Sequence, residues 1–315
     1  MALVALLALV AVAPVAGPGR SGGSPAGTKA EVSGPLYGVT VDRVARLGPV
    51  IDAIEKLPHP PTVRVVFTWN GPTPVPPSRY RVAIRRLDHH ARVMGELLDS
   101  SFEKRVPLAR FTADVKDYVS TLGKAVSIWE IGNEVNGNWT GTYPAVEAKL
   151  VAAYDSVHAA GDTSALTLYA NEYGPHHCGD GAGELTPVQF SERYVPAVVR
   201  DGVSYVLESF YPTGCRGLTT LPTVSTVAAE MRRLHRLYPN ARVGFGELGL
   251  PAAVSPEKAA RVKQVMAWGY GLDPRLSYYV GGYFWWYAYE DCFTGKRLLA
   301  ASLADAFRAE RNALG

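Results

Sequence analysis

The sequence predicts a single-domain α/β protein, a (β/α)8 or TIM barrel, because strand-like and helix-like segments alternate along almost the whole chain. Eight strand candidates, each followed by a helix candidate, occupy residues 34–315. Barrels of this kind routinely fill such a length as one domain. A doubly wound sheet would show the same alternation, but no G-x-G-x-x-G or G-x-x-x-x-G-K-[ST] motif follows any of the strands. We therefore expect one barrel, with its functional groups at the carboxyl ends of the strands.

The eight predicted strands are mostly near-continuous apolar runs, as is typical of parallel strands that are covered on both faces. In order, they are Leu36–Asp42, Thr62–Trp69, Ala91–Leu98, Val126–Asn133, Leu166–Glu172, Ser204–Tyr211, Arg242–Leu248 and Tyr279–Tyr287.

The predicted helices lie between these strands and carry apolar residues at helical spacing. The first, Arg43–Leu57, stops at Pro58, and Ser255 before Pro256 is a favourable pair for a helix start. The remaining candidates are Ser78–Arg86, Phe111–Leu122, Tyr143–Ala160, Val188–Val199, Val224–Leu237, Pro256–Tyr270 and Leu298–Leu314.

The N-terminal segment is predicted to lie outside the barrel. Residues 1–17 contain an unbroken apolar run from Ala2 to Ala13 followed by small residues, which is typical of a signal peptide and too short for a membrane span. An uncleaved anchor is the alternative interpretation. Residues 18–33 are rich in Gly, Ser and Pro and are predicted to be a flexible linker. We therefore expect a secreted or cell-surface protein.

Composition indicates a folded chain and bears on which partners the protein binds. Apolar residues make up 47% of the chain and charged residues 19%, which suits a sizeable core and excludes a disordered chain. The formal net charge is only +3, and the basic residues are scattered, so we expect no nucleic-acid partner. We expect a monomer with no membrane contact beyond the possible N-terminal anchor.

Two glutamates at predicted strand ends are the main candidates for chemistry. Asn133 and Glu134 end the fourth strand, and Glu247 lies in the seventh within Gly246-Glu247-Leu248-Gly249. Strands four and seven lie on different sides of an eight-stranded barrel mouth. Two carboxylates facing each other across a cleft are what glycosidic cleavage requires, because one protonates the leaving oxygen while the other attacks the sugar or activates water.

The motifs Trp129-Glu130-Ile131-Gly132-Asn133-Glu134 and Gly246-Glu247-Leu248-Gly249 resemble those of the clan A glycoside hydrolases, the 4/7 superfamily of retaining (β/α)8 glycosidases. The resemblance spans the barrel from about Gly34 onward and identifies no family within the clan. It implies that Glu134 is the acid/base and Glu247 the nucleophile. The further roles that it implies are binding of the substrate 2-hydroxyl by Asn133, contact with the nucleophile by Tyr211 and Arg64, and a sugar platform at Trp286 or, as the alternative, Trp285.

Other carboxylates compete with this interpretation. Asn171 and Glu172 end the predicted fifth strand and form a rival acid, although we interpret Glu172 as a substrate contact or as a partner for Arg or His. Glu130 lies four residues before Glu134, so strand parity directs it into the barrel. Glu96 and Glu208 are interpreted as interior acids as well. Arg64 has two interpretations of equal weight, contact with the nucleophile or an ion pair with one of these interior acids.

The sequence indicates no metal site and no cofactor. His176, His177 and Cys178 follow the fifth strand and Cys215 follows the sixth, but their spacing matches no zinc motif. A Cys178–Cys215 disulfide, or simply polar loops, explains them better, and Cys292 is the third cysteine.

Together these observations predict retaining hydrolysis of β-glycosidic bonds in an oligosaccharide or polysaccharide. Long loops after strands two, five and six, at residues 70–77, 173–186 and 212–222, are expected to border an open cleft. A non-catalytic carbohydrate-binding barrel is the alternative function, and a barrel enzyme with other acid/base chemistry at the same carboxylates is a weaker third.

Overall fold

The computed structural model describes residues 34–70, 73–173, 184–212, 221–250, 256–294, 297 and 299–314. From Pro35 onward the chain forms one compact unit. The predicted signal peptide and linker, residues 1–33, lie outside the described residues, as do the histidines and cysteines at 176–178 and Cys215. The one cysteine within the described part, Cys292, is a buried free thiol. Within that part, no helix combines the length and apolar character needed to cross a membrane.

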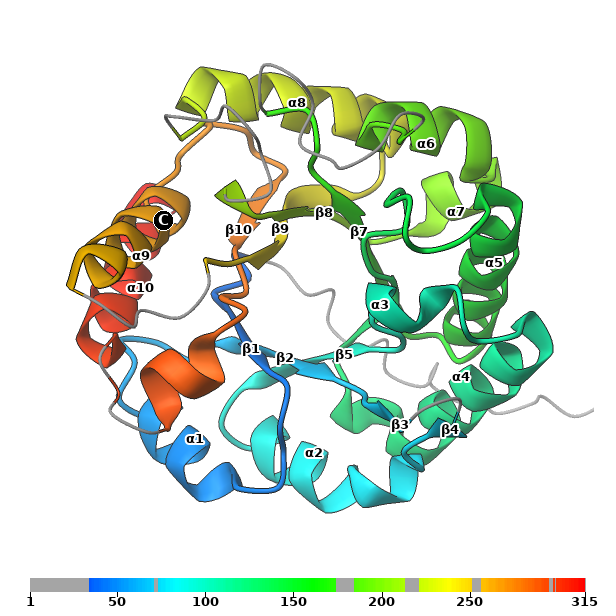
Figure 1. Ribbon diagram of the computed structural model, residues 1–315, viewed down its shortest axis with the longest axis horizontal. Coiled ribbons are helices and arrows are strands. Elements are labelled where there is room, and N and C mark those ends of the chain that lie inside the picture. The colour runs from blue at the N-terminus through cyan, green and yellow to red at the C-terminus, as the bar shows by residue number, and fades with distance from the viewer. Residues whose placement is uncertain are drawn as a thin grey trace, which may run out of the picture. The chain divides into compact units, whose positions relative to one another are not determined.

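Eight parallel strands form the predicted barrel, with the helices arranged around them (Figure 1). The first and last strands meet at a seam, where the Leu36 amide donates to the Val280 carbonyl at 2.8 Å and the Thr40 amide to the Trp285 carbonyl at 3.2 Å. The prediction of a (β/α)8 barrel is therefore confirmed. In ring order the strands are β1 (Gly38–Val41), β2 (Thr62–Val66), β5 (Arg92–Glu96), β6 (Ile128–Gly132), β7 (Thr163–Tyr169), β8 (Tyr205–Phe210), β9 (Arg242–Leu248) and β10 (Tyr279–Gly282).

The helices cover the outside of the barrel with their apolar faces inward. The predicted helix Val188–Val199 is two helices instead, because Pro196 has no amide hydrogen to donate and clashes with a helical residue before it. Their bounds are α1 (Leu47–Ile54), α2 (Arg81–Asp88), α4 (Leu108–Leu122), α5 (Tyr143–Ala159), α6 (Pro187–Tyr194), α7 (Ala197–Gly202), α8 (Val224–Leu237), α9 (Pro256–Tyr270) and α10 (Ala300–Leu314).

Several short elements at the barrel mouth were not predicted. A two-stranded ribbon of β3 (Trp69–Asn70) and β4 (Thr73–Pro74) lies in the loop after β2. The short helix α3 (Ser100–Glu103) follows β5, and the Asp99 carboxylate caps it by accepting the Ser101 amide at 2.8 Å. A π-helical turn covers Tyr289–Phe293, and 3-10 turns cover Pro77–Arg79 and Gly123–Ala125.

Two strands differ from their predicted bounds in ways that matter for the site. The fifth strand begins earlier and ends at Tyr169, so the predicted end at Glu172 is wrong and Glu172 lies in the following loop. The eighth strand ends at Gly282. Tyr283 and Phe284 follow with φ of 59° and 28°, and Trp285 then rejoins the barrel through bridges to β1 and β9. A Cβ atom at Gly282 would collide with the Phe245 carbonyl, so the close approach of these backbones requires glycine there.

Candidate active site

A cavity of about 330 Å³ lies at the carboxyl ends of six successive strands, β5 to β10. Five of the predicted site residues line it together, although they come from distant parts of the sequence. The lining residues are Asp99, Ser100, Asn133, Glu134, Trp139, Tyr169, Tyr211, Glu247, Trp286 and Tyr287.

Glu134 lies just beyond β6 and is held by two hydroxyl groups. The Ser100 hydroxyl donates to its Oε2 at 2.7 Å, and the Ser209 hydroxyl donates to its Oε1 at 2.6 Å. Its φ of 47° places the backbone in the left-handed region, which a glutamate rarely adopts. Burial raises the pKa of the Glu134 carboxyl above its usual range, and the two hydroxyl groups partly oppose that rise.

Glu247 lines the same cavity as Glu134 but has different partners. The Arg64 guanidinium donates to its Oε2 at 2.7 Å, and the Tyr211 hydroxyl donates to its Oε1. Burial raises the pKa of Glu247 to about 8, with Arg64 opposing the rise and the nearby Glu134 carboxyl adding to it. Both oxygens of Glu247 are thus fixed by charged or hydroxyl donors.

Arg64 joins the cavity to a buried layer of acids below it. Its guanidinium is fully buried and contacts Glu130 through two nitrogens at 2.6 and 3.1 Å, and Glu96 at 3.1 Å. The two sequence interpretations of Arg64 are therefore both realised, since it contacts the mouth carboxylate and the interior acids. Burial lowers the pKa of Arg64, but the three surrounding carboxyl groups together outweigh burial and raise the pKa well above its usual value, so Arg64 keeps its charge.

Asn133 and Trp286 complete the predicted set in the cavity. The Asn133 side-chain oxygen accepts the Ser100 amide at 3.1 Å, while its buried Nδ2 has no partner among the described residues. The Arg64 guanidinium lies 5.7 Å from the centre of a half-buried Trp286 ring. Trp285, the alternative platform, is fully buried in the core and does not line the cavity, because the chain turns over between Gly281 and Phe284.

Two acids are not where the sequence suggested. Glu172 does not line the active-site cavity but a second one of about 250 Å³, so it does not join the predicted substrate-binding residues there. The sequence predicts Glu208 to be an interior acid of the barrel. Its carboxylate instead accepts the Tyr173 hydroxyl and lies beside Glu172 and Glu230, while its neighbour Ser209 donates to Glu134. Because adjacent side chains of a strand point to opposite faces, Ser209 points into the barrel and Glu208 points outward.

Sequence reasoning missed the hydroxyl groups that hold Glu134. Ser209 belongs to the segment Ser209-Phe210-Tyr211, in which we singled out only Tyr211. Ser100 follows the predicted end of the third strand, where the pair Asp99-Ser100 is itself a signal for a helix start at the mouth.

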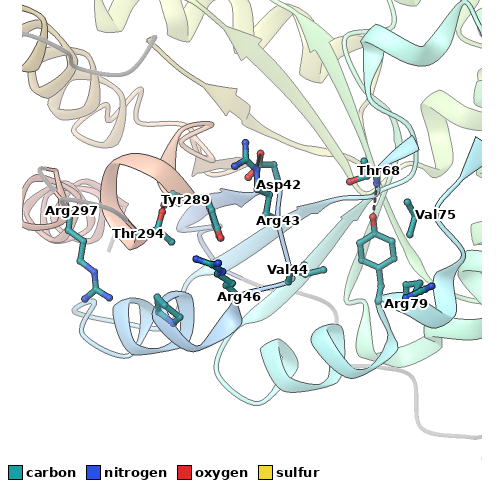
Figure 2. A pocket seen from close by; sticks show the side chains of 13 residues that line it. Asp42, Arg43, Val44, Arg46, Thr68, Val75, Arg79, Tyr289, Thr294 and Arg297 are labelled. Atoms are coloured by element: carbon teal, nitrogen blue, oxygen red, sulfur yellow. Dashed lines mark hydrogen bonds and ion pairs between the residues drawn. The ribbon is translucent and has the colours of Figure 1, made fainter. Parts of the chain in front are cut away.

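A larger groove of about 920 Å³ lies beside this cavity, over the loops that follow β1, β2 and β10. In Figure 2, Arg43 and Arg46 lie between Tyr289 on one side and Thr68 and Val75 on the other. Arg43 is paired with two acids, at 3.3 Å from Asp42 and 3.4 Å from Glu290. The guanidinium groups of Arg46 and Arg79 have no acidic partner among the described residues. Tyr287 lines the cavity and Tyr289 the groove, so the two adjoin along the chain.

The sequence matches no protein-family model and no curated protein. Solved structures do resemble it. A glucosidase from Croceicoccus marinus superposes with a TM-score of 0.57 at 12% identity, covering 87% of this chain and 66% of that one. A GH5-4 broad-specificity endoglucanase from Bacteroides salanitronis gives 0.55 at 14% identity, covering 89% and 93%. A GH10 xylanase from Bispora sp. MEY-1 with xylobiose gives 0.55 at 12% identity, covering 86% and 96%. At these identities the likeness shows a shared barrel fold.

Proposed function

We propose that this protein hydrolyses β-glycosidic bonds with retention of configuration, with Glu134 as the acid/base and Glu247 as the nucleophile. One observation carries the proposal. Two glutamates line the same cavity, and among the described residues the carboxyl group of one contacts a buried guanidinium, while that of the other is hydrogen-bonded by two neutral hydroxyl groups. Such an asymmetry is what a pair of carboxyl groups needs to take the two roles. The barrel fold shared with a glucosidase, an endoglucanase and a xylanase is in keeping with it.

The first step forms a covalent intermediate. The Glu247 carboxylate attacks the anomeric carbon while Glu134 gives its proton to the glycosidic oxygen. The bond between that carbon and oxygen breaks, the departing sugar leaves as an alcohol, and an ester links the remaining sugar to Glu247. Glu134 is left as a carboxylate.

The second step releases the product. The Glu134 carboxylate takes a proton from a water molecule, whose oxygen attacks the same anomeric carbon. The ester bond breaks, Glu247 departs as a carboxylate, and the sugar is freed with its original configuration. Glu134 is protonated again and the cycle is complete.

The active protonation state has one proton on the pair. Two close carboxyl groups in a buried site lose their protons in separate steps, because each charge opposes the other. Burial and repulsion from an ionised Glu134 raise the pKa of Glu247 to about 8. In the form with one proton on the pair, Glu134 is neutral and this repulsion is absent, so we assign the negative charge to Glu247, whose oxygen lies 2.7 Å from the cationic Arg64. The proton then stays on Glu134, whose raised pKa suits a general acid near neutral pH.

The substrate is proposed to be an oligosaccharide or polysaccharide. The free Nδ2 of Asn133 is placed to donate to a sugar hydroxyl, and the Trp286 ring is the platform on which the sugar stacks. Trp139 is 37% exposed at the cavity and offers a second ring. Tyr211 and Arg64 act on the sugar through Glu247, which they hold in place.

A non-catalytic carbohydrate-binding barrel remains the second candidate. It would use the same tryptophans and the same asparagine. It has no need of a nucleophile held by both an arginine and a tyrosine, nor of a second carboxyl group placed opposite, so these contacts favour the enzyme.

The decisive test uses Glu247→Ala with aryl β-glycosides that have good leaving groups. Loss of the nucleophile should lower kcat by a factor on the order of 10⁴ or more. Sodium azide should then restore activity and yield a glycosyl azide of inverted configuration, since azide takes the place of the missing carboxylate.

Glu192→Ala, an exposed carboxylate on α6, is the matched control and should behave like the wild type. Proton NMR of the wild-type reaction should show that the first anomer released keeps the substrate configuration. Near-normal turnover by Glu247→Ala, or release of the inverted anomer, contradicts the proposed mechanism. Sugar binding without any turnover of an aryl glycoside panel favours the binding-protein alternative.

A further inference from the structure

A second cavity, of about 250 Å³, is lined by the loop after β7 and by α8. Glu172 of the loop and Glu230 of α8 line it, and the buried Glu208 of β8 meets both of them. One carboxylate oxygen of each lies within 4.8 Å of those of the other two. We call these three residues the glutamate cluster.

Each member of the glutamate cluster has a buried oxygen with no hydrogen-bond partner among the described residues. Glu208 is fully buried, and its Oε2 accepts the Tyr173 hydroxyl while its Oε1 has no donor. Glu230 is 3% exposed; its Oε2 accepts from Arg233 at 3.2 Å, and its Oε1 is unpaired. Glu172 Oε1 has no donor from another residue type, and only a proton shared with the Glu230 carboxyl group would bond these two acids to each other. Buried polar atoms nearly always have partners, so three orphan oxygens at one point indicate a missing positive ligand.

The charge balance of the cavity also indicates a missing cation. Among the described residues that line it, Arg233 is the single cation, and its side chain is 55% exposed to solvent. Three ionised carboxylates would therefore keep a net charge of minus two.

We propose that the glutamate cluster binds one divalent hard cation, with Ca²⁺ as the preferred ion. An all-oxygen donor set suits Ca²⁺, Mg²⁺ or Mn²⁺ rather than Zn²⁺ or Cu²⁺. A divalent ion would bring the charge of the cluster and Arg233 to zero. The Thr226 side chain and solvent in the cavity supply further oxygens.

The origin of the donor oxygens favours Ca²⁺ over Mg²⁺. The three oxygens lie within 4.8 Å of one another and come from a loop, a strand and a helix. Such a mixed set suits the flexible coordination of Ca²⁺ better than the strict octahedron that Mg²⁺ demands.

The ion would join elements on the outer face of the wall that holds the acid/base. Glu208 precedes Ser209, which points through the other face of β8 to donate to Glu134 at 2.6 Å. Binding would therefore fix β8 against α8 and the end of β7. The role we assign to it is stabilisation of this wall, which requires no part in the chemical steps.

The test is calorimetric titration of the full chain, stripped of metals with EDTA, with CaCl₂ and separately with MgCl₂ at pH 7.5. We expect saturable binding of one Ca²⁺ per chain. At 100 times the dissociation constant, Ca²⁺ should raise the melting temperature by roughly 5–10 °C. Absence of saturable binding by any of Ca²⁺, Mg²⁺ or Mn²⁺ overturns the proposal.

Variants locate the site. Glu208→Gln and Glu230→Gln should lower Ca²⁺ affinity at least tenfold and remove most of the thermal shift, while gaining stability in EDTA because neutral side chains replace acids that repel each other. Glu310→Gln is the matched control, since Glu310 is a buried glutamate with one unpaired oxygen but lies outside the cluster. It should keep the full Ca²⁺ response. Equal Ca²⁺ affinity in wild type and in the Glu208→Gln/Glu230→Gln double variant would place the binding elsewhere and overturn the assignment.

Discussion

The two glutamates of the candidate site owe their different chemistry to the groups that touch them. Glu247 contacts a guanidinium, so its negative form is favoured, whereas Glu134 contacts the hydroxyl groups of Ser100 and Ser209. A hydroxyl donor stabilises a carboxylate less than a cation does. The serines therefore position Glu134 while leaving it able to hold its proton.

Ser209→Ala should shift the pH profile of activity. The wild-type profile of kcat/KM should be a bell with both limbs above the usual carboxyl range, since burial raises the pKa of both glutamates. Loss of the serine donor destabilises the Glu134 carboxylate and raises its pKa further. The alkaline limb, where the acid loses its proton, should then move upward by about half to one pH unit.

The control for this measurement is Ser156→Ala, which removes a hydroxyl on α5 that donates to the Ala152 carbonyl at 2.7 Å. Its profile should coincide with that of the wild type. An alkaline limb that stays in place in Ser209→Ala contradicts the assignment of that limb to Glu134.

The sequence predicts which residues reach the cavity when a motif marks them. It does not predict them when the register of a strand determines the direction of the side chain. Asn133, Glu134 and Glu247 stand out in the sequence, and the structure brings them to one cavity. Ser209 and Glu208 are adjacent, and only the register of β8 settles which one enters the barrel. Composition and spacing leave that question open, because both residues lie in an apolar run.

At the scale of elements, irregular strands surround the site. The pairing of β8 with β9 shifts by one residue at Gly246, next to Glu247, and the pairing of β6 with β7 shifts at Ile131, near Glu134. The pairing of β9 with β10 shifts as well. A bulge changes the face of the strand to which the following side chain points. The sequence does not predict these bulges, because a bulge depends on how both strands pair.

Gly246→Ala should damage both stability and activity. An added Cβ would lie 2.5 Å from the Thr167 hydroxyl and 3.0 Å from Leu207 Cβ, inside the barrel. We expect a loss of about 1–3 kcal/mol in the free energy of unfolding. We also expect a fall in kcat, since the bulge that directs Glu247 must shift.

Gly202→Ala separates these two effects. Its Cβ would meet the Tyr154 ring and hydroxyl, on the outside of the barrel between α7 and α5. This variant should lose stability while keeping the wild-type kcat of its folded fraction. An unchanged kcat in Gly246→Ala would show that the bulge does not set the position of Glu247.

Glu310 on α10 ties that helix to the irregular end of β10 by accepting the Gly282 amide at 3.0 Å. Burial raises its pKa well above the ordinary value, so the folded protein holds a proton that the unfolded chain releases near pH 4.5. Folding then takes up a proton, and stability falls as the pH rises above that value.

Glu310→Gln stays neutral at every pH and keeps an oxygen for the Gly282 amide. Relative to the wild type, it should gain about 1.4 kcal/mol per pH unit between the unfolded and folded pKa values of Glu310. Urea denaturation at pH 5, 7 and 9 measures the difference. A constant difference across this range would show that Glu310 is ionised in the folded protein.

For the whole molecule, the fold could be predicted from the alternation of strand-like and helix-like segments in the sequence. Eight apolar runs separated by amphipathic segments permit few architectures, and the bounds of α8 and α9 agree with the prediction. The β3–β4 ribbon and the turn at Tyr289 could not be predicted, because they depend on the barrel mouth they pack against. The same holds for the meeting of Glu172, Glu208 and Glu230, which only the packing of α8 on the barrel brings about.

The groove beside the cavity predicts a dependence on substrate length. Arg46 and Arg79 offer guanidinium groups to hydroxyl or acidic groups of a long chain, whereas a short aryl glycoside fills only the cavity. The double variant Arg46→Ala/Arg79→Ala should lower kcat/KM for long oligosaccharides by roughly tenfold, the effect of about one charge-assisted hydrogen bond. Activity on aryl glycosides should stay unchanged.

Arg236→Ala, an exposed arginine on α8, is the matched control and should alter neither activity. Equal effects of the double variant on long and short substrates would mean that the groove takes no part in binding.

The seam between the first and last strands has a consequence for how the molecule forms. The Thr40 hydroxyl donates to the Phe284 carbonyl at 2.9 Å, across 244 positions of sequence. Bringing such distant segments together carries a large loop-closure entropy, and contacts of long sequence separation slow folding. We expect ring closure to be a late event in folding. Until the ring closes, the edges of β1 and β10 that face each other at the seam are unpaired, so they can associate with other chains.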